Sequence, residues 1–505
     1  IYAEVAREMV ESGNYLNPTF NYRPWFQHPP LTMWLIALSY RVWGVTPFAV
    51  RFPSLLLALL STILVYSLGR DFTSSSIGGL LSSLCLVSSP AYHLMVRDAK
   101  LDMALLFFIT LAFYAYNKAL KKKTYLLFLY LSLGLAFLTK GPVGIIFPFV
   151  PISLHWYMKR KEITLPKISL IWGISLTLII IVPWYYYMYR TQGTFFLKRI
   201  ILEQNLGRFF ATHYTEPSSP FYYFHTFAWA FLPFLFPFLA SLRSAFLKFK
   251  NSKVLDDGYI IPLLWFFIPF ILMSFSRSKL PQYIFPVLPP ASLLTGVYLW
   301  KVIKKGNISS LFLAFQFLAL AFFLTLFLSL NLIFFPVLAS FSFWFILFLF
   351  FSLFITALVA LRLKSAILLI FVIALTMSIL HFSINFHVDP SLLRYQPSRY
   401  FARELQNLVP NASFVYTYKF SPKPSLVFYC RKKVVKLSGK ELEELLNTSE
   451  GLIIIFPEEE MRNLKMKGYS VKPLAIRSYY PVSRLSWEFL NLRRREEVCR
   501  DIILG

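Results

Sequence analysis

A succession of apolar runs between residues 53 and 386 constrains this chain more than any other feature. About twelve of these runs have the roughly 17–25 residues that a helix needs to cross a bilayer. They lie near residues 53–69, 77–96, 101–118, 124–139, 141–157, 168–188, 221–243, 258–275, 281–300, 311–334, 340–361 and 365–386. Because lipid offers no hydrogen-bond partners to the backbone, such runs form helices. We therefore predict an α-helical polytopic membrane protein.

Residues 387–505 differ from the rest and resemble ordinary globular protein. The whole chain is 57% hydrophobic, whereas a soluble domain is about 45–50% apolar. Helical patterns cover 392–409, 440–447 and 457–467, and strand patterns cover "SFVYTYKF", "SLVFYC", "KKVVKL" and "GLIIIF". We expect a soluble α/β domain at the C-terminus.

The net charge of +27 lies mainly between the apolar runs, and not in the C-terminal domain. That domain has 20 Lys and Arg against 13 Asp and Glu, which leaves +20 for the membrane part. Loops on one side of the predicted membrane hold 18 basic residues and those on the other side hold nine. Basic loops face the cytoplasm, so the charge indicates topology and does not indicate nucleic-acid binding.

This orientation divides the chain into three extracytoplasmic or spanning regions. Residues 1–50 form a first extracytoplasmic loop with interfacial helices, and residues 51–386 form the transmembrane domain with an extracytoplasmic loop at 189–220. Residues 387–505 form an extracytoplasmic domain. Because residues 1–50 lie outside and the sequence opens at Ile1, we expect one further span upstream.

The extracytoplasmic charges are mixed in sign and stand against span ends, where ionisable groups are costly unless they are paired or functional. In "RDAKLD", Asp98 and Asp102 share one helical face, and Arg97 and Lys100 stand beside them. The two carboxylates fit either a helix N-terminus, which favours negative charge, or acid–base chemistry on a bound anion. They are our candidate catalytic residues.

Basic residues at two other outward turns are candidates for binding a phosphate. Lys140 lies in "FLTKGPVG", and Arg277 and Lys279 lie in "SRSKLPQY". The alternatives are a snorkelling lysine at the first turn and contacts with ordinary lipid headgroups at the second. Arg97 and Arg208 are further candidates for the same phosphate.

Polar residues in three loops complete the candidate site. Gln27 and His28 precede Pro29–Pro30, and Tyr283 follows "SKLPQ"; we expect all three at a substrate cavity. His213 and Glu216 could share a divalent metal ion such as Zn, Mg or Mn, although two ligands without a third make a weak site.

Eight segments, in order from residue 2 to about residue 290, resemble one family. They are "YAEVAREMVESGNYLNP", "FQHPPLTMWL", "RDAKLDMALLFF", "FLTKGPVG", "VPWY", "NLGRFF", "PFYYFHTFAWAFLPF" and "SRSKLPQYIFPVLP". The order is similar to that of the bacterial dolichyl-phosphate-mannose–protein mannosyltransferase-like family, which includes the transferase that places 4-amino-4-deoxy-L-arabinose on lipid A. From residue 291 onward the resemblance is architectural only.

The resemblance implies a GT-C glycosyltransferase of the bacterial inner membrane. Such enzymes move a sugar from a polyprenyl-phosphate donor to a lipid A-like lipid, a glycan or a protein on the extracytoplasmic face, typically with inversion. Asp102 matches an acid of the family, and Lys140, Arg277 and Lys279 match basic positions expected near phosphate. The family's main acid would lie upstream of Ile1. Gln27 stands where the lipid A branch has a metal-binding Glu, so a metal at that position would need His28 instead.

Two other functions fit a basic outward cavity. A transporter or flippase of an anionic lipid would also require charged or broken helices near the bilayer midplane and pseudo-symmetric halves. A non-catalytic envelope scaffold would depend on the surface of residues 387–505, and not on Asp102 or Lys140.

Overall fold

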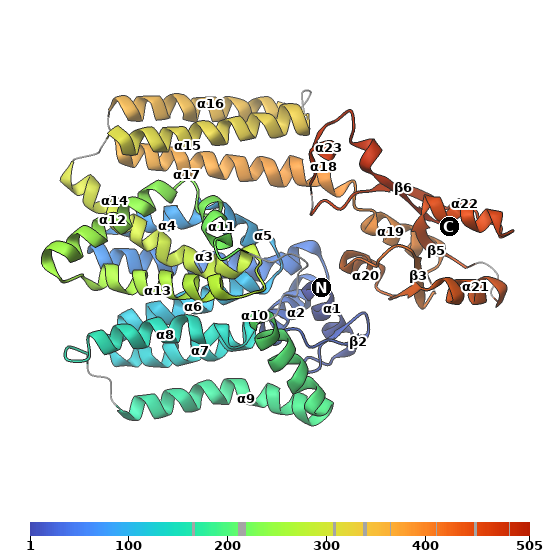
Figure 1. The fold of residues 1–505 in the computed structure, drawn as a ribbon, viewed down its shortest axis with the longest axis horizontal. Helices are drawn as coiled ribbons and strands as arrows, with labels where there is room; N and C mark the ends of the chain where they lie inside the picture. The colour runs from blue at the N-terminus through green and yellow to red at the C-terminus, as the bar shows by residue number, and fades with distance from the viewer. Residues whose placement is uncertain are drawn as a thin grey trace.

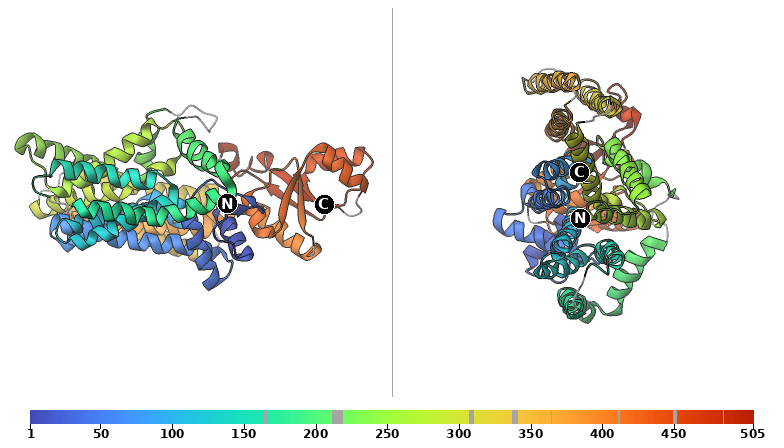
Figure 2. Two further views of the ribbon diagram at one scale, coloured as in Figure 1. Left: turned by 90° about the horizontal axis from the view of Figure 1, so that it is seen from below. Right: turned by 90° about the vertical axis from the view of Figure 1, so that its left-hand side faces the viewer.

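The computed structural model describes residues 1–163, 167–210, 219–306, 310–336, 341–363, 365–410, 412–448, 452–483 and 485–505. A helical bundle and a C-terminal domain lie end to end along the long axis of the molecule (Figures 1 and 2). The N-terminal segment lies between them. Functional groups at this end of the bundle are therefore within reach of all three parts.

The N-terminal segment consists of two helices joined by a short hairpin. It comprises α1 (Tyr2–Ser12), β1 (Thr19–Phe20), β2 (Arg23–Pro24) and α2 (Leu31–Trp43). Helix α1 ends at Gly13, whose φ of 71° is the left-handed conformation that glycine adopts at helix C-termini. Its fully buried Arg7 binds Glu4 at 2.5 Å and also pairs with Glu11. Both pairs lie within α1 and stabilise this helix.

The bundle begins with α3 and follows the predicted order of apolar runs. The Thr46 hydroxyl accepts a hydrogen bond from the backbone N–H of Ala49, and Pro47 occupies the first helical position, so the sequence specifies where α3 starts.

Gly296 allows the helix that contains it to pack closely against the helix that contains Ser82, because a Cβ at Gly296 would lie 2.7 Å from the Cα of Ser82. The helices are α3 (Pro47–Thr73), α4 (Ser76–Val87), α5 (Pro90–Arg97), α6 (Leu101–Ala119), α7 (Leu126–Lys140), α8 (Val143–Met158), α9 (Lys167–Leu197), α10 (Arg208–Phe210), α11 (Tyr222–Ala230), α12 (Leu235–Ser252), α13 (Asp257–Phe275), α14 (Leu288–Lys305), α15 (Ser310–Leu328), α16 (Phe341–Arg362) and α17 (Ala366–Ser383).

Six helices among the described residues are long and apolar enough to cross a membrane, or up to eight if two bent pairs each count as one span. The chain is therefore a multi-pass membrane protein. The bent pairs are α4 with α5, at 67°, and α11 with α12, at 114°. Both correspond to runs that we expected to be continuous, 77–96 and 221–243. The bends occur where Pro90 and Pro233 interrupt the backbone hydrogen bonding. The count of about twelve crossings, and the further span upstream, stay predictions.

Ion pairs between helix ends occur at both ends of the bundle, as expected for a chain whose loops alternate between the two sides. At one end, Lys118 pairs with Asp71 at 2.7 Å, which joins the C-terminal ends of α6 and α3. At the other end, the N-terminus of α6 meets the C-terminus of α7 through the 2.6 Å contact between Asp102 and Lys140. The predicted catalytic carboxylate and Lys140 therefore lie at the same end of the bundle.

The C-terminal domain is a five-stranded sheet with helices, in the order β4-β3-β5-β7-β6. Strands β3, β4 and β5 are parallel, and β7 runs antiparallel between β5 and β6. Its elements are α19 (Ser398–Leu408), β3 (Phe414–Tyr418), α20 (Pro424–Cys430), β4 (Lys433–Leu437), α21 (Gly439–Thr448), β5 (Ile454–Pro457), α22 (Glu458–Met466), β6 (Ala475–Tyr479), α23 (Trp487–Leu490) and β7 (Arg500–Leu504). The predicted strand at "SLVFYC" is wrong. This segment is α20, since Pro424 starts a helix and periodicity in a short apolar run does not distinguish helix from strand.

Polar contacts of Asn21, Arg97 and Arg495 help to attach the C-terminal domain to the rest of the protein. The side chain of Asn21 donates a hydrogen bond to the backbone oxygen of Val434 at 2.8 Å and accepts one from its N–H at 2.9 Å. Arg97 pairs with Asp389 in α18 (Asp389–Leu393), and Arg495 donates to the backbone oxygen of Phe334 at 2.6 Å. The domain is therefore held over the same end of the bundle that carries Asp102.

Candidate active site

A buried ion pair between Asp102 and Lys140 is the centre of the candidate site. Asp102 lies in the first turn of α6, and Lys140 is the last residue of α7, which Gly141 ends with a φ of 74°. Lys140 Nζ donates to Asp102 Oδ1 at 2.6 Å, and the two side chains are only 13% and 8% exposed. Each charge lies at the helix end that favours it, because a helix dipole stabilises carboxylates at N-termini and cations at C-termini. The sequence places these residues in separate outward turns, and the fold brings them together.

One cavity lies on the Lys140 side of this ion pair. Tyr283, in the 3-10 helix η3 (Pro281–Val287), places its ring 4.7 Å from Lys140 Nζ, within the range of a cation–π contact. The lining is His28, Leu105, Lys140, Val143, Phe147, Gln204, Asn205, Phe209, Met273, Ser276 and Tyr283. Five of the eleven lining residues are apolar and six are polar or charged, so the cavity can contact both apolar and polar parts of a ligand.

A second cavity lies on the Asp102 side. Asp98, Lys100 and Asp102 line it together with Trp229 and Gln282. Lys100 Nζ binds Asp98 Oδ2 at 2.5 Å, and both side chains are well exposed, in contrast to the buried pair beside them. The ion pair therefore stands between two cavities: Asp102 lines one together with Asp98 and Lys100, and Lys140 lines the other. Such an arrangement can hold an acceptor near a carboxylate and an anionic leaving group near a lysine.

Arg97, which we expected at the donor phosphate, faces another direction. Its guanidinium pairs with Asp389 and donates to Asn385 Oδ1 at 3.1 Å, so it contacts the segment that leads into the C-terminal domain. Arg97 lines a third cavity, which it shares with Asp98 but not with Lys140. The Arg97 side chain thus reaches the segment that leads into the C-terminal domain, and its role at a phosphate stays a prediction.

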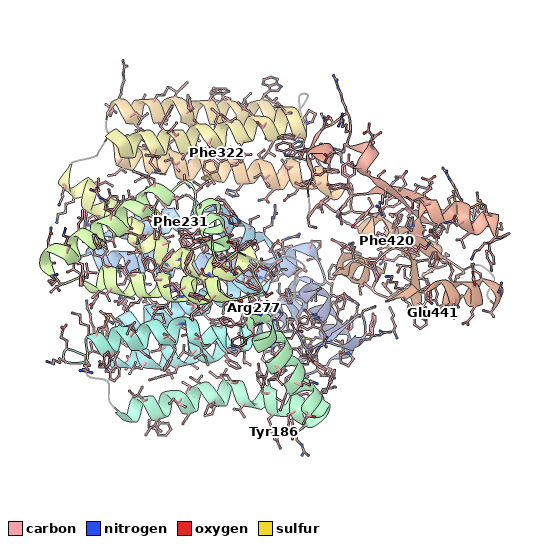
Figure 3. All side chains as sticks on the ribbon, in the orientation of Figure 1. Tyr186, Phe231, Arg277, Phe322, Phe420 and Glu441 are labelled. Carbon is pink, nitrogen blue, oxygen red and sulfur yellow. The ribbon has the colours of Figure 1, made fainter. Side chains whose placement is uncertain are left out.

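The turn between α13 and η3 carries the other predicted phosphate-binding pair. Arg277 is exposed at the end of the bundle that faces the N-terminal segment, as Figure 3 shows, and its backbone N–H donates to the oxygen of Phe209 at 3.0 Å. Lys279 is buried, and burial lowers its pKa. Ser276, at the start of this turn, lines the Lys140 cavity. The two basic residues thus stand beside this cavity.

His28 lines the Lys140 cavity, and its ring lies 6.0 Å from Tyr2 and 6.1 Å from Trp25. Gln27 is half-buried beside it and is not among the residues that line this cavity. The roles predicted for Gln27 and His28 in substrate binding stay predictions.

The predicted metal ligands His213 and Glu216, and the side chain of Arg208, lie outside the described residues. In the part of the chain that the structure describes, no group of three or more His, Cys, Asp or Glu side chains could hold a metal ion. A divalent metal in this site stays a prediction, as does the role of Arg208.

Reasoning from sequence missed one residue of the site, Gln204, and one buried acid of the N-terminal segment, Glu8. Gln204 lines the Lys140 cavity, and its buried Oε1 has no hydrogen-bond partner among the described residues, so it can accept from a ligand hydroxyl. Glu8 in α1 is buried with hydrogen bonds from Thr19 and from the backbone of Tyr22, and burial raises its pKa to about 7. The sequence signal for Glu8 was the run of charged residues in "YAEVAREMVES", and the signal for Gln204 was the polar pair in "EQN".

The family model described as dolichyl-phosphate-mannose-protein mannosyltransferase matches residues 27–187. A relative from Aquifex aeolicus, an uncharacterized protein, is 30% identical over 310 residues, which cover 60% of this chain and 68% of the relative. The chain belongs to this mannosyltransferase family. The family that the ordered segments predicted is thereby confirmed.

Other members of the family extend the comparison. An undecaprenyl phosphate-alpha-4-amino-4-deoxy-L-arabinose arabinosyl transferase from Wigglesworthia glossinidia brevipalpis is 27% identical over 316 residues, or 61% of this chain and 54% of the relative. The chain spans about half the length of the curated transferases that it matches. A crystal structure of ArnT from Cupriavidus metallidurans bound to undecaprenyl phosphate superposes with a TM-score of 0.76 at 18% identity, covering 100% of this chain and 92% of that one. The two proteins share a fold.

Proposed function

We propose that this family member is a membrane glycosyltransferase that takes a sugar from a polyprenyl-phosphate-linked donor and transfers it to an acceptor on the extracytoplasmic face. The observation that carries the proposal is the buried contact of 2.6 Å between Lys140 and Asp102, with a cavity on each side. A reaction that separates an anionic leaving group from an acceptor hydroxyl needs a cation and a base next to each other, in a site that excludes bulk water.

Each residue of the pair has a distinct role. The acceptor hydroxyl attacks the anomeric carbon, the bond from this carbon to the phosphate oxygen breaks, and the polyprenyl phosphate leaves with one further negative charge. Lys140 neutralises this charge, with Arg277 and Lys279 beside it, and Asp102 takes or orients the acceptor proton. Asp98 holds the acceptor from the outer side of the same cavity. Tyr283 keeps the ammonium group in place through its ring.

The location follows from the same topology. The excess of basic loops at the other end of the bundle supports an orientation in which residues 1–50, the site and residues 387–505 lie outside the cytoplasm. The relatives' printed names and the bound ligand of the ArnT structure support undecaprenyl phosphate as the carrier. We place the protein in the bacterial inner membrane, with a lipid, a glycan or a protein as acceptor.

The test compares lipids that co-purify with the protein in mild detergent. Wild-type protein should retain polyprenyl phosphate, detected by mass spectrometry, and an Arg277→Ala, Lys279→Ala double variant should lose most of it. Arg493→Ala, Arg494→Ala is the matched control, because both side chains are exposed in the C-terminal domain. Only bulk phospholipid in all three samples would refute the transferase. Transbilayer movement of a lipid without sugar transfer would instead indicate a flippase.

A further inference from the structure

A second basic pocket lies where the C-terminal domain meets the start of α3. Helix α19 contributes Arg399, Ala402, Arg403 and Gln406, whose spacing of three and four residues places them on one helical face. The remaining lining residues come from the turn before α3 and from the end of α20: Val45, Pro47, Phe428, Tyr429 and Arg431. Helix α3 is long and apolar enough to cross a membrane, so the pocket lies at one end of a candidate span.

Arg431 reaches this pocket from an unusual backbone conformation. Its φ of 52° lies in the left-handed region, which costs a non-glycine residue about 1–2 kcal/mol. The backbone is held there by two contacts: its N–H donates to the oxygen of Val427 at 3.2 Å, and its oxygen accepts from the Tyr22 hydroxyl at 3.2 Å. A glycine would meet the same backbone requirement without strain. The arginine therefore supplies something that the turn itself does not need.

The pocket carries three guanidinium groups without an acidic partner. Among the described residues, no carboxylate lies within 4.0 Å of Arg399, Arg403 or Arg431. The nearby Glu4 already binds Arg7 at 2.5 Å. Three cations that share one pocket repel one another, and a bound anion removes this repulsion. The fork-shaped guanidinium group matches the oxygens of a phosphate.

The pocket also adjoins a cavity that borders the candidate active site. It shares Pro47, Phe428 and Tyr429 with the cavity that Arg97 and Asp98 line. That cavity shares Asp98 with the one that Asp102 lines. A chain of adjoining cavities thus leads from the three arginines to the ion pair between Asp102 and Lys140. A ligand anchored at one end can present a second group at the other.

We propose that this pocket is a second anion site, separate from the donor phosphate site, which binds the phosphate of a lipid headgroup. Arg399 and Arg403 bind the phosphate from α19, and Arg431 binds it from the end of α20. The headgroup belongs either to a phosphorylated glycolipid acceptor or to bulk anionic phospholipid that seats the C-terminal domain on the membrane. Its part in acceptor binding rests on the proposed function, whereas the binding of phosphate itself does not.

The experiment uses the full chain in detergent, titrated with lipids and followed by native mass spectrometry. The probes are a synthetic monophosphorylated disaccharide glycolipid, phosphatidylglycerol and undecaprenyl phosphate. An Arg399→Ala, Arg403→Ala variant should bind the glycolipid, the phosphatidylglycerol or both at least tenfold more weakly than wild type. Its affinity for undecaprenyl phosphate should stay within a factor of two, which also shows that the variant is folded. Arg493→Ala, Arg494→Ala removes the same charge from an exposed site elsewhere and should match wild type.

The results separate this proposal from the proposed function. Selective loss of the glycolipid supports an acceptor site, and equal loss of glycolipid and phosphatidylglycerol supports a general headgroup site. Unchanged affinity of the α19 variant for both lipids overturns the second anion site, even where undecaprenyl phosphate binds normally. Equal weakening in the matched control also overturns it, because a long-range effect of net charge would then explain the loss. Absence of undecaprenyl phosphate binding in wild type refutes the proposed function and leaves the headgroup result intact.

Discussion

Replacing Asp102 with Asn should separate donor binding from transfer. In the present structure the ammonium of Lys140 is neutralised by Asp102 at 2.6 Å. A phosphate that contacts Lys140 from the other side would lie about 5 Å from this carboxylate. Two like charges at that distance repel by about 3 kcal/mol at an effective dielectric constant of about 20. Asparagine removes the repulsion and nearly conserves the shape, so polyprenyl phosphate should bind at least tenfold more tightly.

Transfer should change in the opposite direction. Loss of a positioned base lowers turnover by about 10²–10⁴-fold. Asp71→Asn is the matched control, since Asp71 pairs with Lys118 at 2.7 Å at the opposite end of the bundle and should affect neither quantity. Binding is measured by titration with the radiolabelled lipid phosphate, and transfer by release of sugar from the donor. Weaker binding by Asp102→Asn, or turnover near that of wild type, would refute the reasoning.

Unfolding is the competing explanation, because removing one partner of a buried ion pair costs about 3–5 kcal/mol. Thermal unfolding in detergent distinguishes the two. A folded variant with tight binding and no transfer supports the assigned roles, whereas a variant that loses both binding and its unfolding transition assigns the pair to stability alone.

Three further outcomes follow from residues around the site. Burial raises the pKa of Glu8 from 4.5 to about 7, so between these pH values the native state holds a proton that the unfolded chain has released. The free energy of unfolding should therefore fall by up to about 3 kcal/mol as pH rises from about 4.5 to 7. Glu8→Gln should flatten this pH dependence, measured by thermal unfolding. Asn21→Ala removes two hydrogen bonds to Val434, each contributing about 0.5–1.5 kcal/mol, so amide exchange in β4 should become about tenfold faster. Tyr283→Leu removes the ring beside Lys140 and should weaken binding of polyprenyl phosphate several-fold, whereas Tyr283→Phe should retain it in the same titration.

Each of these predictions has a contrary result. Equal pH slopes for wild type and Glu8→Gln would assign the pH dependence to other groups. Faster exchange in β3 as well as β4 after Asn21→Ala would indicate loss of the whole sheet and not of one attachment. Equal effects of leucine and phenylalanine at position 283 would show that the hydroxyl, and not the ring, supports Lys140.

Much of the fold could be predicted from the sequence, because a lipid bilayer strongly constrains the length and polarity of the helices that cross it. Apolar runs gave the bundle helices, and the alternation of loops correctly placed Asp102 and Lys140 at the same end. Their direct contact was not readable, since nothing in a sequence states which of several outward turns are neighbours. The bends at α4–α5 and α11–α12 were missed because hydropathy is the same for a straight and a broken helix.

The missed part of the site involves pairs that are remote in sequence. The phosphate role of Arg97 stays a prediction, but its ion-pair partner Asp389 lies 292 residues away at the entrance to the C-terminal domain and could not be predicted from "RDAKLD". Gln204 gave no sequence signal beyond a polar pair in a loop. Its significance comes from burial without a partner, which only a three-dimensional structure reveals.

The contact between Asn21 and Val434 has a consequence for solubility. Strand β4 is an outer strand of its sheet, so its free side is a template on which a strand from another molecule can pair and begin aggregation. The amide of Asn21 occupies both the N–H and the oxygen of Val434 on that side, in the manner of a short strand. We therefore expect the N-terminal segment to protect the C-terminal domain from self-association. A fragment containing residues 387–505 alone should precipitate more readily than the same domain joined to residues 1–50.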